Sequence, residues 1–443
     1  MGKQLRRALL AGIAVTALLA GTAGPAAAHP RGPDAVVADW IDRNAQGLAS
    51  TDPTDPTDDL GLLDDIAGGA AVVGLGESTH GSREQFRVKH RMARYVVEEM
   101  GFRTIGLEHD FAQGTTIDRY VLTGEGDPRQ LVEGMSFPFW VSEEMVDLIE
   151  WMRSFNEAHD DKVRFLGTDV TALRELSFDE VTGYVRRVAP DRLGDLERTL
   201  APIRPTGPGH IQWYQQLSED ERRQLIDTAR DASRLVQDVP ATAASMEREY
   251  AEQHARAIVG WYESYDNLEF GPEREVFVAD TIAWWQRTIG GKLAYWAANV
   301  HVTSADSVTY RHPEGGWTGK TAGGYLEDRL GSRYVAIASV FGHGNISSDF
   351  TQPGPHPIGP PPAGLLDATL GTAGPSPYLV DLHAPAPGPV KAWRSGPSSA
   401  RMILPSYAED DDGAAYVMSV ESLAAAFDAI VYSRDTTATR LLG

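Results

Sequence analysis

The stretch from residue 71 to 111, AVVGLGESTHGSREQFRVKHRMARYVVEEMGFRTIGLEHDF, constrains the fold more than any other part of the chain. Ala71 to Leu75 is a short apolar run with two β-branched valines and adjoining glycines, which is typical of a buried strand. Apolar residues recur at helical spacing from about Ser82 to Met100, and Gly101 follows where a helix ends. Thr104 to Leu107 is a second strand. The pattern predicts a βαβ unit with parallel strands.

Polar side chains follow both of these strands. Glu77 and His80 lie in the glycine-rich turn after the first strand, and Glu108 and Asp110 come directly after the second. In open sheets of this kind, ligands bind outside the carboxyl ends of the strands. The sequence therefore predicts a functional site at this edge of the sheet.

Composition excludes several classes of protein. The formal net charge of −22 gives a surface that repels phosphate backbones, so we expect no nucleic-acid partner. The absence of cysteine excludes disulfides, thiolate zinc sites and cysteine nucleophiles. A chain of 443 residues is long enough for one large domain or two ordinary ones.

The N-terminus has the pattern of a secretory signal peptide. A basic start with Lys3, Arg6 and Arg7 precedes an apolar core that is too short for an ordinary membrane span. Ala26 to Ala28 provide an A-x-A cleavage site, so residues 1–28 are the expected signal peptide. The protein is therefore expected to be exported, and the mature chain contains no other stretch that predicts a membrane span.

The rest of the chain divides into three expected parts. Residues 29–173 form the first part of an α/β core, and residues 266–443 form its second part, with Pro/Gly-rich loops. Between them, residues 174–265 have dense charges and helical spacing, which predicts a helical insertion or lid over the active-site cleft. The expected fold class is α/β, with a mostly parallel central sheet and flanking helices.

Individual elements follow from local patterns. The stretch 50–59, STDPTDPTDD, is rich in Pro and Asp and is expected to be a solvated linker. Residues 350–400 are expected to form long surface loops. The expected helices are Pro33–Asn44, Leu60–Ile66, Thr115–Val121, a helix capped by Ser142, Glu273–Thr288 and Tyr325–Leu330. The further expected strands are Val163–Leu166, Lys292–Val302 ending near His301, Tyr334–Phe341, an edge strand within Leu370–Leu382, and Phe427–Tyr432.

His80 and Glu77 are the first candidates for chemistry. An imidazole has an ordinary pKa of about 6.5, so it can accept a proton from water near neutral pH. A carboxylate three residues away in a tight turn can fix its tautomer. The structural alternative is that Glu77 caps the following helix and His80 is an ordinary loop histidine.

The other candidates come from strand ends and from one helix. Lys89 lies on the apolar face of its helix, where it either reaches Glu77 or Glu108 or extends its ammonium to the surface. Strand alternation places Glu108 and Asp110 on one side and His109 on the other, so one of the three is expected to face the site and another to make a structural hydrogen bond.

Three more residues have weaker signals. Asp169 follows a predicted strand end, and His301 ends another, although a histidine in an apolar strand is commonly a core residue. Arg274 is expected to pair with one of the acids, as a structural salt bridge. His343, between two glycines, is a minor candidate. The chain has no G-x-S-x-G elbow, no H-E-x-x-H motif and no P-loop, which argues against a standard serine hydrolase.

From about Leu60 to Tyr432 the sequence resembles the erythromycin esterase family. The resemblance is carried by separate blocks in one order. These blocks are VVGLGESTHG, the helix with Lys89 and Arg94, MGFRTIGLEHDF, RYVLTGEGD, SEEMVDLIEWMRSFN, RFLGTD, the RE pair at 274–275, YWAANVHV and GGYLEDRLGSRYVAIASVFGHG.

The resemblance implies hydrolysis of a macrolide lactone, or of another bulky or cyclic ester, by a water molecule activated on His80. It implies that Glu77 orients this base and that Glu108, Lys89 and His301 line the pocket. Two departures stand out: position 298 is alanine where many relatives have His-Asn-x-His, and Lys89 replaces an arginine found in some esterases. Asp110, Asp169 and Arg274 are expected substrate-binding residues.

Two alternatives remain open from the sequence. One is a metal-dependent hydrolase of a different ester or amide, with Glu77, His80, Glu108 and His301 as ligands for a divalent ion. The other is a catalytically decayed homologue that only binds a ligand. We expect the protein to hydrolyse a small-molecule substrate and to need no cofactor.

Overall fold

The computed structural model describes residues 33–207, 209–240, 245–266, 271–347, 354–404, 407 and 413–443. The predicted signal peptide, residues 1–28, lies outside these residues.

A nine-stranded sheet forms the centre, in the order β1-β10-β13-β8-β2-β5-β3-β4, with β9 paired to β8. The strands are β1 Gln46–Gly47, β2 Val72–Glu77, β3 Phe102–Asp110, β4 Arg164–Asp169, β5 Lys292–Ala298, β8 Tyr334–Ile346, β9 His356–Ile358, β10 Tyr378–Asp381 and β13 Ala429–Thr436. The run from β13 to β4 is parallel, and β1, β9 and β10 are antiparallel to their neighbours.

The predicted βαβ unit is present as β2, α3 (Arg83–Glu98) and β3. The Ser82 hydroxyl caps α3 by accepting the backbone N–H of Gln85 at 3.2 Å. The two strands are not neighbours, because β5 lies between them and pairs with both. The fold thereby brings a strand that begins at Lys292 into the middle of the unit formed by the first third of the chain.

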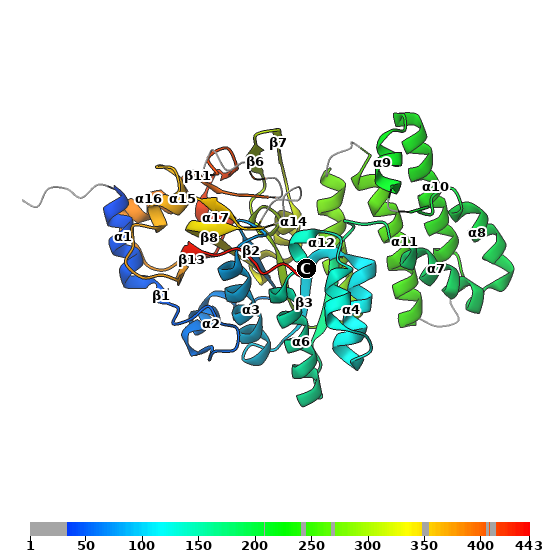
Figure 1. Cartoon of the computed structure of the whole chain (residues 1–443), viewed down its shortest axis with the longest axis horizontal. Coiled ribbons are helices and arrows are strands. Elements are labelled where there is room, and N and C mark those ends of the chain that lie inside the picture. The colour runs from blue at the N-terminus through cyan, green and yellow to red at the C-terminus, as the bar shows by residue number, and fades with distance from the viewer. Residues whose placement is uncertain are drawn as a thin grey trace, which may run out of the picture.

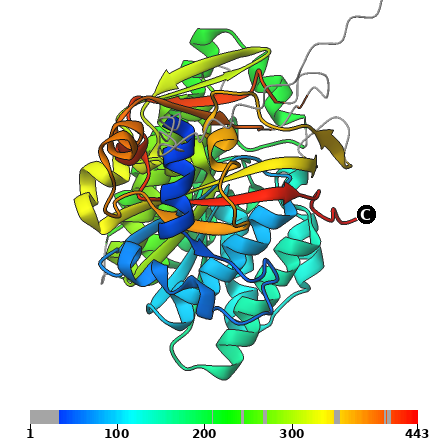
Figure 2. The same ribbon diagram turned by 90° about the vertical axis from the view of Figure 1, so that its left-hand side faces the viewer.

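Helices cover both faces of the sheet (Figure 1). Strand alternation supplies the two apolar layers; in β5, for example, Tyr295 and Trp296 join different core clusters. On the face of Trp296 the core is completed by α2 Leu62–Ala67, α3, α5 Pro128–Glu133 and α6 Glu143–Ala158, with α4 Phe111–Thr123 at the β3–β4 end. On the face of Tyr295 it is completed by α12 Pro272–Thr288, α13 Asn299–Val302 and α14 Ala322–Leu330. Figure 2 shows α1 (Pro33–Asn44) at the sheet end formed by β1, β10 and β13.

Helices fill the stretch between β4 and α12, as the residue spacing predicts. They are α7 Glu175–Val188, α8 Leu193–Leu200, α9 His210–Gln215, α10 Glu219–Gln237 and α11 Met246–Ser264, and they lie to the right of the sheet in Figure 1. Tyr214, Trp261 and Tyr262 are buried among them. Within the described residues, the short 3-10 helices are η1 Asp58–Leu60, η2 Pro138–Trp140, η3 Pro190–Arg192 and η4 Gly331–Arg333.

A second, antiparallel sheet was not predicted. Its strands are β6 Val308–His312, β7 Gly315–Gly319, β11 Ser398–Arg401 and β12 Val417–Val420, in the order β11-β12-β6-β7. Glycine-rich β7 and short β11 carry little apolar alternation, so sequence pattern alone does not reveal them. The expectation of long loops over 350–400 is also wrong in part, because this stretch contributes β9, β10, α15 Leu366–Leu370, α16 Gly388–Ser395 and most of β11. The last short helix is α17 Leu423–Ala426.

Two further expectations need correction. The stretch 50–59 is held against α3 rather than free in solvent, because Arg87, Arg91 and Arg94 bind its carboxylates and carbonyl groups. The strand that begins at Lys292 ends at Ala298, and His301 lies in the single helical turn α13. Of the helices in the described part of the chain, none combines the length and apolar character needed to cross a bilayer.

Candidate active site

The predicted site residues meet where the parallel strands end. Glu77 ends β2, Glu108 lies near the end of β3, and Asp169 ends β4. His301 follows β5 in α13, and Arg274 lies in the first turn of α12. All five side chains are buried. These side chains form one buried polar cluster, although their segments lie up to 224 positions apart in the sequence, from residue 77 to residue 301.

His80 is held by Glu77, and Glu77 is held by Lys89. The His80 Nδ1 lies 2.9 Å from Glu77 Oε1, and the Lys89 ammonium forms an ion pair with Glu77 Oε2. Lys89 is fully buried and also lies over the Trp296 ring, 4.4 Å from its centroid. Burial lowers the pKa of Lys89 well below its ordinary value, and the charge of Glu108 opposes this shift. The predicted inward orientation of Lys89 is confirmed.

Aromatic rings surround the His80 imidazole. Phe139 stacks on it with ring centroids 4.1 Å apart and an interplanar angle of 8°, and Trp140 lies at 5.2 Å. Burial lowers the pKa of His80 to about 4, the Glu108 carboxylate opposes this shift, and the charges of His301 and Arg274 add to it. The imidazole is thus neutral at pH 7. With Nδ1–H directed at Glu77, its Nε2 carries the lone pair.

Glu108 is fixed as a carboxylate. Its Oε2 accepts the backbone N–H of Ala298 at 2.9 Å, and its Oε1 accepts from Arg274 Nη2 at 3.0 Å. Burial disfavours the charged form, but His301, through its charge and a hydrogen bond, lowers the pKa of Glu108 well below its usual range, with His80 and Arg274 contributing. Position 298 therefore supports the site through its backbone N–H.

His301 has the opposite charge state from His80. Its Nδ1 lies 2.8 Å from Glu275 Oε1, and its Nε2 lies 3.3 Å from Glu108 Oε1. Burial opposes the charged form, but these two carboxylates raise the pKa of His301 to about 10. The site thus contains one neutral histidine and one imidazolium, each fixed by its surroundings.

Asp169 and Arg274 form a bidentate pair behind Glu108. The Arg274 Nε lies 3.0 Å from both Asp169 oxygens, while Nη2 bridges Asp169 and Glu108. Burial raises the pKa of Asp169, and the Arg274 charge opposes the shift. The expected pairing of Arg274 with the strand-end acids is confirmed, and its geometry is that of a structural clamp.

Asp110, His343 and Ser78 lie outside this cluster of contacts. Asp110 accepts the Gln113 N–H at 2.9 Å and so caps α4. His343 is half-exposed next to Asp435. Ser78 donates its backbone N–H to the Gln85 side-chain oxygen, and its hydroxyl oxygen accepts from the Gln85 amide nitrogen. The structure thus separates the predicted acids into a buried cluster and a helix cap.

Two residues of the site were not predicted. Glu275 has one sequence signal, an acid that directly follows Arg274 at the start of a helix. Phe139 lies in the aromatic run Phe137-Pro138-Phe139-Trp140, which has no periodic pattern. Neither contact is visible in sequence spacing, because each joins elements far apart in the chain.

The donor atoms of Glu77, His80 and Glu108 lie within 4.8 Å of one another, close enough to hold a metal ion. Their surroundings fit an ion poorly. Glu77 is already paired with Lys89, and Glu108 with Arg274 and His301. A divalent ion here would have to displace Lys89 or lie among fixed cations. The chemistry of this donor set therefore favours a cluster completed by the protein's own charges.

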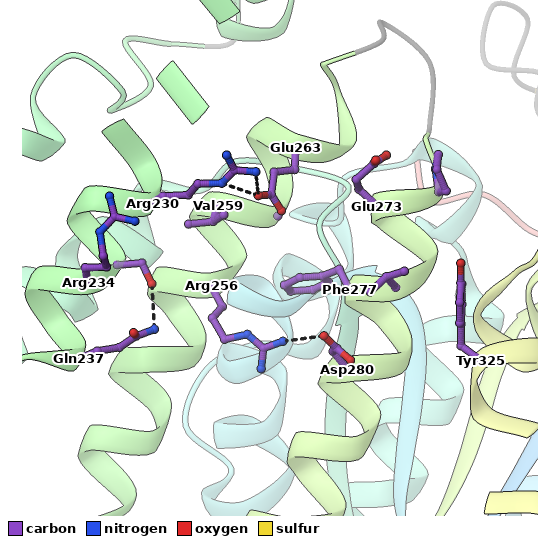
Figure 3. A pocket seen from close by; sticks show the side chains of 14 residues that line it. Arg230, Arg234, Gln237, Arg256, Val259, Glu263, Glu273, Phe277, Asp280 and Tyr325 are labelled. Carbon is purple, nitrogen blue, oxygen red and sulfur yellow. Dashed lines mark hydrogen bonds and ion pairs between the residues drawn. The ribbon is translucent and has the colours of Figure 1, made fainter. Parts of the chain in front are cut away.

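A cavity of about 570 Å³ lies elsewhere, between α10, α11 and α12 (Figure 3). Glu273, Phe277 and Asp280 line it from α12, and Arg256 on its far side pairs with Asp280 at 3.2 Å. At 100° per residue, Glu275 lies on the side of α12 opposite these positions, and Arg274 lies about a quarter-turn from them. None of the residues that line the cavity belongs to the polar cluster around His80.

Comparison with known proteins places this chain in a family. The family model for erythromycin esterase matches residues 97–436, which include Glu108, Arg274 and His301. Glu77, His80 and Lys89 precede the matched region. The match covers far more than half of the chain.

Curated relatives and solved structures agree with this match. The chain is 25% identical over 373 residues to a protein named putative hydrolase YbfO from Bacillus subtilis (strain 168), covering 78% of this chain and 81% of that one. It is 31% identical over 132 residues, 30% of this chain and 31% of the other, to erythromycin esterase type II from Escherichia coli.

The structural likeness is extensive. A crystal structure from Bacillus cereus superposes with a TM-score of 0.81 at 25% identity, covering 94% of this chain and all (100%) of that one. A structure titled succinoglycan biosynthesis protein gives a TM-score of 0.78 at 28% identity, covering 92% and 98%. A mutant of the erythromycin esterase EreC in its open conformation gives 0.67 at 17% identity, covering 89% and 98%, which shows a shared fold. With its mostly parallel sheet and a family match over residues 97–436, the chain belongs to the erythromycin esterase family.

Proposed function

We propose that this member of a hydrolase family cleaves a carboxylic ester with a water molecule activated by His80. The observation that carries the proposal is the arrangement of two buried histidines at one edge of the sheet: Glu77 lies 2.9 Å from Nδ1 of His80, whereas His301 lies between Glu275 and Glu108. A neutral, oriented imidazole is what a general base requires, and a fixed cation nearby is what a developing oxyanion requires.

In the proposed mechanism, water donates a proton to His80 Nε2 and its oxygen attacks the ester carbonyl carbon. Glu77 accepts the Nδ1–H throughout, so it stabilises the imidazolium that forms. The positive charges of His301 and Arg274, which act on His80, also stabilise the negative oxygen of the tetrahedral intermediate that forms beside it. When the intermediate collapses, the proton on Nε2 passes to the leaving alkoxide, which departs as an alcohol and leaves a carboxylic acid.

For the substrate we propose a bulky or cyclic ester, such as a macrolide lactone. The support is the family match and the partial identity to erythromycin esterase type II. The alternative is a homologue that binds a ligand without turning it over. A panel of macrolides and simpler esters, incubated with the wild type and His80→Asn and followed by mass spectrometry, separates the two. We also propose export, on the basis of the N-terminal sequence alone.

The dependence of activity on pH tests the identity of the base. Only neutral His80 can accept a proton, so kcat/KM should rise with pH through a midpoint near the pKa of His80, about 4, rather than near the ordinary 6.5. The measurement is a pH–rate profile, with circular dichroism at each pH to confirm that the protein stays folded. A midpoint near 6.5 in folded protein would mean that the base is another, solvated group.

Metal removal tests the alternative of a metal-dependent hydrolase. Because Lys89, Arg274 and His301 already neutralise the donor carboxylates, we expect dialysis against a chelator to leave kcat/KM unchanged. Metal content is measured before and after dialysis. Loss of activity that Zn²⁺ or Mn²⁺ restores would contradict the proposed mechanism and favour ligation by Glu77, His80 and Glu108.

A further inference from the structure

One face of the proposed base is covered by a short aromatic segment, residues 134–140, between α5 and α6. Phe139 stacks on His80, and Phe137 stacks on Phe139 with centroids 5.1 Å apart and an interplanar angle of 20°. Phe139 and Trp140 are buried, and Phe137 is partly exposed. The position of the imidazole therefore depends on where this segment lies.

Arg174 holds the segment in place. Its Nη2 donates to the Gly134 carbonyl at 2.9 Å, to the Ser136 hydroxyl oxygen at 3.0 Å and to Asp110 Oδ2 at 3.1 Å. Ser136 in turn donates its hydroxyl to the same Asp110 oxygen at 2.6 Å. The segment is thus tied to a carboxylate at the end of β3.

Both anchors of this tie are well fixed. Asp110 is buried and caps α4 through the Gln113 N–H, and the charges of His109 and Arg174 help to lower its pKa although burial raises it. Arg174 is the residue directly before α7, where the helical stretch begins. A guanidinium suits this position because its planar fork can reach several acceptors at once, which an ammonium does less well.

We propose that Arg174 is a positioning residue that, through Ser136 and Asp110, keeps the aromatic segment against His80. It does not contact the base itself: its hydrogen bonds go to Gly134, Ser136 and Asp110, and it connects the start of the helical region to the segment that stacks on the imidazole. The effect on turnover rests on the proposed function; the effect on the position of His80 does not.

The first test is kinetic. In Arg174→Met the segment loses its tie, and we expect kcat/KM to fall by about 10- to 100-fold, mainly through kcat, because small misplacements of a catalytic group have effects of this size. Ser136→Ala removes only the hydrogen bonds of the Ser136 hydroxyl to Asp110 and Arg174. It replaces Arg174→Met in this test if that variant does not fold. Arg186→Met, an exposed arginine on α7 with a long contact to Glu197, is the matched control and should leave activity unchanged.

The second test is independent of activity. Histidine labelled with ¹³C at Cε1 gives one NMR signal per imidazole, and His80→Asn identifies the His80 signal. The stacked Phe139 ring shifts this signal, so it should move in Arg174→Met and Ser136→Ala but not in Arg186→Met. An unmoved His80 signal in folded Arg174→Met overturns the inference. A moved signal, in a protein that hydrolyses no ester even as the wild type, supports the positioning role and rejects the proposed function.

Discussion

In His80→Asn, kcat/KM for ester hydrolysis should fall by about 10²- to 10⁴-fold, the range that general-base catalysis contributes. Asparagine can still reach Glu77 with its amide, so the turn after β2 keeps a hydrogen bond at this place. It cannot accept a proton from water at Nε2. The variant therefore removes the base while retaining the polar contact, and steady-state kinetics on a hydrolysed ester measure the loss.

His343→Asn is the matched control for this variant. His343 is half-exposed and lies outside the polar cluster, so the same replacement there should leave kcat/KM unchanged. Equal activity of His80→Asn and the wild type would remove His80 from the mechanism. An equal loss in both variants would point to a general effect on the protein rather than to the base.

Arg274→Met should lower the free energy of unfolding by about 3–5 kcal/mol, because removing one partner of a buried ion pair leaves the other charge uncompensated. Arg274 is the partner of both Asp169 and Glu108, and all three side chains are at most 6% exposed. Burial already raises the pKa of Asp169 against the charge of Arg274, so without the guanidinium this carboxyl should become protonated. Urea unfolding followed by circular dichroism measures the change.

Arg287→Met controls for the loss of an arginine from the same helix. Arg287 lies exposed in the last turn of α12, where its replacement should change stability little. If Arg274→Met and Arg287→Met were equally stable, the clamp would not support the fold, and its role would have to be confined to the chemistry of the site.

Much of this molecule was predicted from local patterns. The strand–turn–helix–strand unit from Ala71 to Asp110 could be recognised because apolar spacing and glycine positions are properties of consecutive residues. The helical character of residues 174–265 and the inward position of Lys89 follow from the same kind of information. The placement of Glu77, Glu108 and Asp169 at one edge needed only the rule that parallel strands end on the same side.

Other features have no local signal. The second sheet joins β6 and β7 to β11 and β12, which come much later in the chain; its strands are short, and β7 is rich in glycine. The stretch 50–59 is polar, as a linker is, yet Arg87, Arg91 and Arg94 bind it to α3. Such contacts depend on which surfaces the fold brings together, and this information is not contained in residue spacing.

The sequence by itself determined which residues can do chemistry and which strand ends carry them, because residue type and periodicity are local. Only the tertiary structure decided their charge states. His80 and His301 are the same residue type, but burial beside Phe139 keeps the first neutral, whereas Glu275 and Glu108 keep the second charged. A pKa is set by burial and by neighbouring charges, and both arise from segments that meet only after folding.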